Sequence, residues 1–383
     1  MKKYVLAVAV ACAPFSLSFA AETKGVMTTI APLHSLVQGV MGETGEAELL
    51  IQGYASPHNY QLKPSQIRKL QKSNFVFYIG GGFEGFLSKT LETLPSHIRK
   101  ISMANKARLE VLENRAGGAW EAHAHSGHAH EGDEHDSEHE REHTKDKGHD
   151  HEKDHAKNHG HDKKHADEEE HKHAHEDDHK HADEAEHKDE HAHEHEHGSS
   201  DDHDADMHST SDDHHFWLDP DNAVEIVKTI TRELSVVYPE NQDLYKQNAK
   251  ATIARIRATD QQLAKELEAV KDIPYIVFHD AYQYFEKHYE LTAVGSILLE
   301  PDEKPGVGRI REIRRKLIDS KAVCIFREPQ FSDKLVKTVL EGTEAKSGTL
   351  DPIGSEIAVG ENQYTDLLKS LSRGLQDCLK SQK

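Results

Sequence analysis

Two absences limit what this chain can be. After the first 20 residues, no segment is long and apolar enough to cross a bilayer, which takes about 20 apolar residues. We therefore expect a soluble product with no stable membrane insertion of its own. In addition, the segment 121–213 contains one large apolar residue, Met207. Burying apolar side chains is what offsets the entropy of ordering a chain, so we expect this segment to be disordered in the absence of a ligand.

The N-terminus has the organisation of a secretory signal peptide. It begins with Lys2 and Lys3, continues through apolar residues to Phe19, and ends on small residues. This pattern predicts removal of residues 1–20 and a mature chain that begins at Ala21. A lipoprotein attached through Cys12 is the alternative, although it would leave an unusually short apolar region. Either interpretation means that the chain is exported.

Cysteine is scarce, with three in 383 residues. If Cys12 leaves with the signal peptide, only Cys324 and Cys378 remain. An exported chain meets an oxidising compartment, so we predict a disulfide between them. Two buried free thiols are the alternative.

The segment 121–213, called the His-rich insert below, is abundant in two residue types. It holds 25 of the 32 histidines, and 33 Asp and Glu against 10 Lys and Arg. Its net charge is −23 and that of the whole chain is −21, so the remainder is close to neutral. The acidity therefore says nothing about a nucleic-acid or membrane partner of the folded part, and we expect no nucleic-acid partner. Imidazole and carboxylate are ligands for zinc, copper and nickel. A solvated polyampholyte linker is the alternative, but a linker does not require histidine.

The remaining chain alternates short apolar runs with helical patterns, before the insert and again after it. This alternation predicts an α/β fold in which small parallel sheets are flanked by helices. About 270 residues is more than one core usually serves, so we expect two lobes. We assign residues 21–239, with the insert, to the N-terminal lobe, 240–271 to a long rigid connecting helix, and 272–383 to the C-terminal lobe. Segments 67–79 and 313–326 both read as a basic helix, a serine and an apolar strand, which suggests related lobes.

Four metal-competent side chains follow predicted strands or the insert. His58 lies in a loop after the run ending at Ile51, His215 lies where order is expected to return after the insert, His279 follows an apolar strand, and Asp351 follows Leu350. Ligands of parallel α/β sheets bind beyond the carboxyl ends of the strands, so a cleft between lobes is expected to collect all four.

Three imidazoles suit tetrahedral zinc and leave one position for a carboxylate or water. Asp280 and Glu328 are expected to accept hydrogen bonds that fix the imidazole tautomers. Three histidines with an open position also describe zinc hydrolases. However, no general base with a substrate pocket is evident, so we predict that the chain is not an enzyme.

Six motifs occur together in one order along the chain: Ser56-Pro57-His58-Asn59-Tyr60, Lys63-Pro64-Ser65, His215-Phe216-Trp217-Leu218-Asp219-Pro220, Phe278-His279-Asp280-Ala281-Tyr282, Arg327-Glu328-Pro329-Gln330-Phe331 and Leu350-Asp351-Pro352. This combination resembles the periplasmic zinc-binding component of high-affinity zinc ABC transporters, over essentially the whole mature chain.

The resemblance implies a two-lobed periplasmic receptor with one long backbone helix, in which His58, His215 and His279 bind Zn2+. It also implies a disulfide that maps onto Cys324 and Cys378. Some zinc relatives have an acidic residue just before the first histidine, where this chain has Pro57. Water or Asp351 is then left as the fourth ligand.

The expected function is capture of Zn2+ in the periplasm by a monomer and delivery to an ABC permease. The insert is expected to collect zinc at low affinity or, alternatively, to sense abundant zinc. A zinc store without a transporter is a further alternative. Because imidazole must be deprotonated to bind, affinity is expected to fall as the pH drops through about 6.5.

Overall fold

The computed structural model describes residues 21–115, 120, 212–298, 301 and 305–380. The predicted signal peptide and all of the His-rich insert except its last two residues lie outside this range.

The first sheet has four parallel strands, in the order β2-β1-β3-β4. They are β1 (Val26–Thr28), β2 (Ala47–Leu49), β3 (Phe75–Tyr78) and β4 (Arg99–Ser102). Between and after them come α1 (Ala31–Met41), α2 (Pro64–Leu70), α3 (Ser88–Thr93) and α4 (Met103–Lys106). A 3-10 turn at 85–87 directly precedes α3. This sheet and its helices form the first lobe.

The second sheet repeats this arrangement. It contains β7 (Tyr275–His279), β8 (Ala293–Leu298), β9 (Cys324–Arg327) and β10 (Lys346–Thr349), all parallel, in the order β10-β9-β7-β8. Helices α7 (Gln283–His288), α8 (Val307–Asp319) and α9 (Lys334–Leu340) accompany it. Counted along the chain, each sheet has the order second, first, third, fourth strand. The predicted pair of related α/β lobes is confirmed, and the two similar segments supply the third strand of each sheet.

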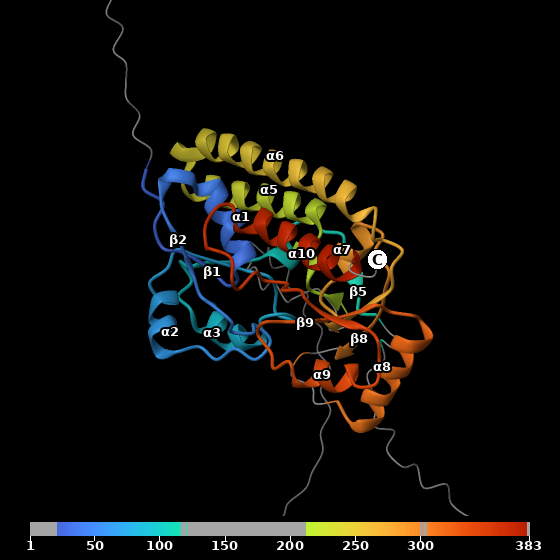
Figure 1. The fold of residues 1–383 in the computed structure, drawn as a ribbon. Coiled ribbons are helices and arrows are strands. Elements are labelled where there is room, and N and C mark those ends of the chain that lie inside the picture. Colours follow the sequence, from blue (N-terminus) through green and yellow to red (C-terminus); the bar gives the residue numbers. More distant parts are fainter. Residues whose placement is uncertain (1–20, 116–119, 121–211, 299–300, 302–304, 381–383) are drawn as a thin grey trace, which may run out of the picture. The chain divides into compact units, whose positions relative to one another are not determined.

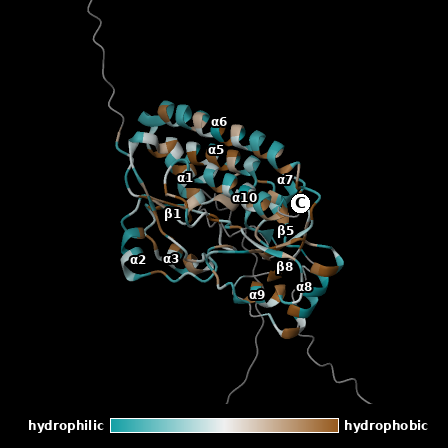
Figure 2. Cartoon of the chain, in the orientation of Figure 1, coloured by the Kyte–Doolittle hydropathy of each residue, from teal (hydrophilic) through white to brown (hydrophobic). Residues whose placement is uncertain are grey.

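Three longer helices complete the fold: α5 (Pro220–Val237), α6 (Gln242–Leu267) and α10 (Gln363–Leu379). The 26 residues of α6 extend about 39 Å at 1.5 Å per residue. Helices α1 and α10, from the two halves of the chain, both pack against α6, and α5 runs beside it (Figure 1). Hydrophobic and hydrophilic residues alternate along α6 in Figure 2, as expected for a helix with one face on the core. The predicted long connecting helix is thus present.

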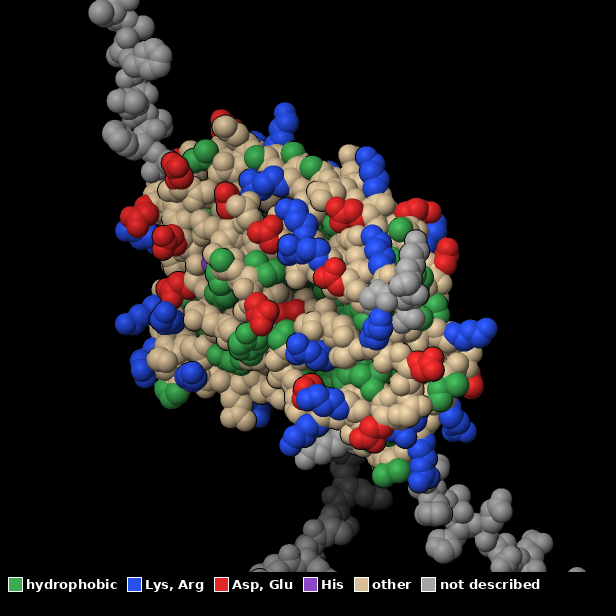
Figure 3. All heavy atoms as spheres, in the orientation of Figure 1, with side chains coloured by type: hydrophobic (Ala, Val, Ile, Leu, Met, Phe, Trp, Pro, Cys, Tyr) green, Lys and Arg blue, Asp and Glu red, His purple; other side chains and the backbone are tan. Residues whose placement is uncertain are grey.

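The predicted disulfide is present between Cys324 of β9 and Cys378 of α10, with an S–S distance of 2.02 Å. It fixes the C-terminal helix to the second sheet. Among the described residues, no helix combines the length and the apolar character that crossing a membrane requires. Lys and Arg are interspersed with Asp and Glu over the face in Figure 3, in keeping with a folded part close to neutral.

The boundary of the insert needs a correction. Its last two residues form strand β6 (Asp212–Asp213), which pairs antiparallel with β5 (Leu112–Glu113). Asp213 is buried, so the described chain is already ordered at residue 212. Neither residue of β6 is apolar, so no pattern in the sequence indicates a strand here. The strand is held by backbone pairing with β5 and by the buried Asp213 carboxylate, and not by an apolar side chain.

Candidate metal centre

His58 stands in the loop that joins β2 to α2. Its backbone N–H lies 3.3 Å from the Ser56 hydroxyl oxygen, and the loop ends where Pro64 begins α2. Gln66 of α2 secures the loop, because its side-chain amide donates to the Leu50 carbonyl at 2.7 Å and its side-chain oxygen accepts from the Lys63 N–H at 2.9 Å. The His58 ring packs edge-on against Phe83, with 5.1 Å between ring centroids. His58 is half-buried, the most exposed of the three candidate histidines.

His215 lies between β6 and the 3-10 turn Phe216–Leu218. The chain then enters α5 at Asp219, whose carboxylate caps the helix by accepting from the Asp221 N–H at 2.7 Å. One oxygen of Asp213 accepts from the His215 backbone at 2.9 Å and lies 2.8 Å from its Nδ1. This carboxylate fixes both the backbone and the ring of His215.

His279 is the last residue of β7 and is 2% exposed. Its Nδ1 lies 2.7 Å from Oε1 of Glu328, which follows β9, and the Tyr282 hydroxyl donates to the same oxygen at 3.1 Å. Burial raises the pKa of Glu328 to about 8, although the hydrogen bond from Tyr282 acts to lower it. A cation bound at His279 would favour the ionised carboxylate, with the shared proton on Nδ1.

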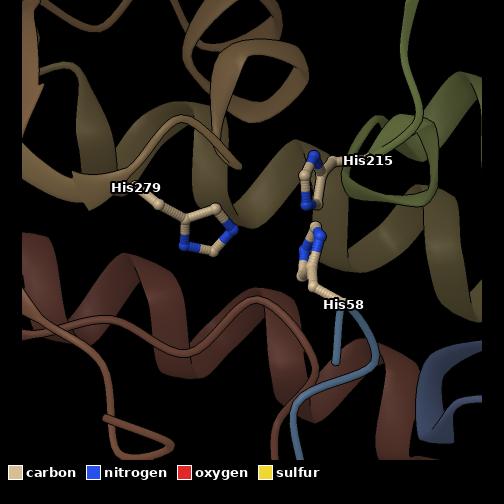
Figure 4. Close-up of side chains that lie close together, drawn as sticks. All are labelled: His58, His215 and His279. Atoms are coloured by element: carbon tan, nitrogen blue, oxygen red, sulfur yellow. The ribbon is translucent and has the colours of Figure 1, made fainter. Parts of the chain in front are cut away.

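The three histidines meet although they come from three distant parts of the chain. One nitrogen of each lies within 4.8 Å of one nitrogen of each of the others, and the ring centroids are 5.4–5.5 Å apart. Figure 4 shows the rings facing one another, His58 from the first lobe, His279 from the second and His215 from the segment before α5. Residues of both halves line the pocket around them, including Pro57, Phe83, Trp217, Phe331 and Pro352.

Such a site offers three nitrogen donors in a largely apolar pocket. Asp213 and Glu328 occupy Nδ1 of His215 and His279, so Nε2 is the nitrogen through which each ring can bind a metal ion. Imidazole donors and this geometry fit a borderline divalent ion such as zinc. The chemistry of the donor set therefore agrees with the ligand predicted from the sequence.

The structure brings Glu328 to an imidazole but places Asp280 elsewhere. The Asp280 carboxylate accepts from Nε of Arg115 at 2.9 Å and 3.0 Å, and also bonds an Nη atom of the same guanidinium. Asp280 directly follows the last residue of β7, and its carboxylate bonds Arg115 instead of an imidazole.

Asp351 lies outside the group of three histidines. Its two oxygens accept from the backbone N–H groups of residues 353, 354 and 355 at 2.6–3.1 Å, from the Ser355 hydroxyl at 2.6 Å and from the Gln330 amide at 2.7 Å. The carboxylate thus shapes the loop after β10, and its lone pairs already have five donors.

Sequence reasoning did not single out Asp213, which the structure places 2.8 Å from Nδ1 of His215. It precedes His215 by two residues, which was the available indication, because a residue at that spacing can hydrogen-bond a following backbone N–H. It was assigned instead to the acidic insert.

A second group of side chains has metal-competent atoms, namely Asp219, Asp221 and His288. Nδ1 of His288 lies 3.2 Å from Asp219, and Nε2 lies 2.8 Å from Asp260. Burial alone would lower the pKa of His288, but the hydrogen bonds to Asp219 and Asp260 outweigh it and raise the pKa to about 9. His288 is therefore protonated near neutral pH, with carboxylates at both nitrogens, and forms an ion cluster rather than a metal site.

Comparison with known proteins gives consistent matches. The family model described as zinc-uptake complex component A, periplasmic (ZnuA), matches residues 26–378. The high-affinity zinc uptake system protein ZnuA of Brucella abortus is 38% identical over 362 residues, which cover 94% of this chain and 93% of that protein. The protein of the same name from Yersinia pestis is 30% identical over 381 residues, or 99% and 98% of the two chains.

Solved structures share the fold at low sequence identity. A crystal structure of ZnuA matches with a TM-score of 0.62 and 18% identity, covering 94% of this chain and 100% of that one. The solute-binding protein FpvC of Pseudomonas aeruginosa in complex with Mn2+ matches with a TM-score of 0.63 and 16% identity, at 94% and 100% coverage. These neighbours have the same two-lobed architecture of parallel sheets and helices.

Proposed function

Because this chain belongs to the family of periplasmic zinc-uptake components, we propose that His58, His215 and His279 together hold the zinc ion that it carries. Family membership makes the chain a zinc-binding periplasmic component of an ABC transport system, not an enzyme. The proposal adds where the ion binds. The observation that carries it is the convergence of three imidazoles within 4.8 Å, from segments far apart in the sequence.

Three properties of the pocket support zinc at these residues. Neutral imidazole is a strong ligand for zinc, and two of the three rings are oriented by carboxylates at Nδ1. The aromatic side chains of Phe83, Trp217 and Phe331 line the pocket, and such apolar surroundings strengthen the attraction between the ion and its ligands. We assign the fourth position of a tetrahedral site to water, because the Asp351 carboxylate is engaged by five donors.

We further propose that the loaded protein, acting as a monomer, delivers zinc to the membrane permease of the transporter. The long helix α6, packed against helices from both halves, limits how far the two lobes can open. Release is then expected through a small displacement of one ligand. His58 is the candidate, since it is half-buried and lies in a loop, whereas His279 ends a buried strand.

The His-rich insert is proposed to collect zinc at low affinity and to raise its concentration near the pocket. Many weak sites on one chain give a high effective concentration without any new contact. The insert ends at β6, whose Asp213 bonds His215, so collected ions would be released close to the pocket. A sensing role is the alternative. Deletion of the insert distinguishes the two, since collection predicts slower uptake at scarce zinc and sensing predicts loss of inhibition at ample zinc.

The test of the site is a zinc competition titration against a chromogenic chelator. It compares the mature chain, a variant without residues 121–211, and that variant with His58, His215 or His279 changed to Ala. His97→Ala is the matched control, because His97 is an exposed histidine of the first lobe.

We expect one tight site in the variant without the insert, weakened by about tenfold or more by each of the three changes and unaffected by the control. Loss of tight binding together with the insert would contradict the assignment.

A further inference from the structure

One hydroxyl group of the second lobe bonds both strands of the ribbon formed by β5 and β6. The Tyr284 hydroxyl of α7 accepts from the Leu112 N–H of β5 at 2.9 Å and donates to the Asp213 carbonyl of β6 at 2.6 Å. Asp213 in turn holds the ring of His215. The position of this ribbon therefore determines the position of one of the three candidate zinc ligands.

A second anchor lies two residues beyond β5. Arg115 bonds the Asp280 carboxylate through Nε and Nη2, and its Nη1 donates to Glu286 of α7 at 2.7 Å. Asp280 directly follows His279, another candidate ligand. The guanidinium thus joins the chain that leaves β5 to the residue beside His279. The Trp120 ring covers it, with 3.5 Å between the guanidinium carbon and the ring centroid.

The ion group around Arg115 is buried and asymmetric in charge. The side chains of Arg115, Asp280 and Glu286 are 20%, 8% and 4% exposed. Without the guanidinium, the two buried carboxyl groups would have lost their common cation, so the ribbon and α7 would separate or rearrange.

We propose that Arg115 and Tyr284 are positioning residues for zinc binding. They clamp the β5–β6 ribbon to the second lobe and thereby fix His215 and His279 at the separation that one zinc ion requires. This inference rests on the proposed function, because it concerns the same three histidines. It predicts that zinc affinity depends on two residues that do not line the pocket.

Two simpler accounts predict different results. If Arg115 acts only through its charge, its removal would strengthen the binding of a cation, because a positive charge near the ion is lost. If it acts only as a stabilising ion pair, its removal would lower the midpoint of thermal unfolding and leave zinc affinity unchanged. Positioning predicts weaker zinc binding and an altered coordination geometry.

The experiment compares Arg115→Met, Arg115→Lys and Tyr284→Phe in the full mature chain. The matched control is Arg99→Met, because Arg99 at the start of β4 pairs with Glu233 at 2.7 Å, at the opposite end of the sheet from the pocket. Zinc affinity is measured by chelator competition, coordination geometry by the visible absorption of bound Co2+, and folding by thermal unfolding of the zinc-free protein.

We expect Arg115→Met to weaken zinc binding by about tenfold, as the loss of an outer partner of metal ligands does, and to change the cobalt absorption bands. The zinc affinity of Arg115→Lys should lie between those of Arg115→Met and the unmodified chain, since lysine keeps the charge but lacks the planar guanidinium group. Arg99→Met should lower the unfolding midpoint without changing zinc affinity or the cobalt absorption bands. Zinc affinity within about twofold of the unmodified chain, with unchanged cobalt bands, would overturn the inference.

If Arg115→Met does not fold, Tyr284→Phe tests the inference in its place. This variant removes the other anchor at the cost of a single oxygen atom. Weaker zinc binding with cooperative unfolding retained supports the clamp, and unchanged binding overturns it. His279→Ala is measured in parallel. If it also binds zinc normally, the proposed site itself is wrong. If it loses zinc while Arg115→Met and Tyr284→Phe do not, only the clamp is wrong.

Discussion

His279 and His288 lie nine residues apart, and each has a carboxylate at Nδ1, yet their surroundings give them opposite properties. Nδ1 of His279 bonds Glu328, and the ring turns its other side toward His58 and His215 (Figure 4). His288 meets Asp219 at Nδ1 and Asp260 at Nε2. One acidic partner orients an imidazole for a metal ion, whereas two partners at opposite nitrogens favour the imidazolium.

The comparison shows why proximity alone does not identify a metal site. Both groups place three metal-competent side chains within reach of one ion. In the second group, however, an ion would have to displace a proton from His288, whose pKa is about 9, and compete with Arg257, which bonds Asp221. The number and placement of acidic neighbours therefore distinguish a binding site from a structural ion cluster.

Exchanging one histidine from each group for alanine should give the largest contrast. His279→Ala should weaken zinc binding by more than about hundredfold, because it removes a ligand and not merely an outer partner. His288→Ala should leave zinc affinity within about twofold. Chelator competition measures both, and comparable losses in the two variants would mean that the His288 group also binds or controls the ion.

The carboxylates that orient the imidazoles should have the next largest effect. Glu328→Gln and Asp213→Asn each keep the size of the side chain but remove the charge at Nδ1. We expect each to weaken zinc binding by about ten- to hundredfold. The same titration, accompanied by thermal unfolding of the zinc-free variants, separates this effect from loss of fold. Unchanged affinity in either variant would show that the corresponding ring is held by other contacts.

Much of the fold was predictable from the sequence, because each lobe repeats a local pattern. Alternating apolar runs and helical segments predicted two parallel sheets, and the similar segments 67–79 and 313–326 indicated their relation. The long helix and the disulfide between Cys324 and Cys378 were also predicted. The sheets and the long helix depend on residues near one another in the sequence. The disulfide was predictable because only two cysteines remain after the predicted signal peptide.

The candidate site was predictable only in part, and the reason is distance along the chain. His58, His215 and His279 were identified by their places after strands and by a family resemblance. Arg115 and Asp280, in contrast, are 165 residues apart, and nothing local to either indicates the pairing. Tyr284 contacts both strands of a ribbon whose sequence lacks the usual strand residues, so its role became visible only in three dimensions.

The His288 cluster should reveal itself in the dependence of stability on pH. Because folding raises the pKa of His288 from 6.5 to about 9, its contribution is fully present below pH 6.5 and is lost as the pH rises toward 9. His288 is partly exposed, so solvent screening reduces its contribution to the unfolding free energy. We expect about 1–2 kcal/mol, which is less than the full pKa shift would give. The difference in unfolding free energy between the unmodified chain and His288→Gln should therefore shrink by that amount from pH 6 to pH 9.5.

Urea denaturation at both pH values measures this difference, and the variant serves as the control for every other group that titrates in the interval. A difference that stays constant, or grows with pH, would contradict an imidazolium in the folded protein.

A change at Asp351 should have little effect on zinc affinity, and it is the sharpest test of which group is the fourth ligand. An asparagine at this position keeps one acceptor oxygen but loses the second, so it cannot satisfy all of the donors in the loop after β10. We expect Asp351→Asn to lower the thermal unfolding midpoint and to change zinc affinity by no more than about twofold, because its carboxylate lies outside the group of three histidines. A loss as large as that of His279→Ala would instead make Asp351 a ligand. Zinc binding would then have to break the hydrogen bonds of the loop after β10. The fourth ligand would move onto the ion from the second lobe, so the site would not be preformed.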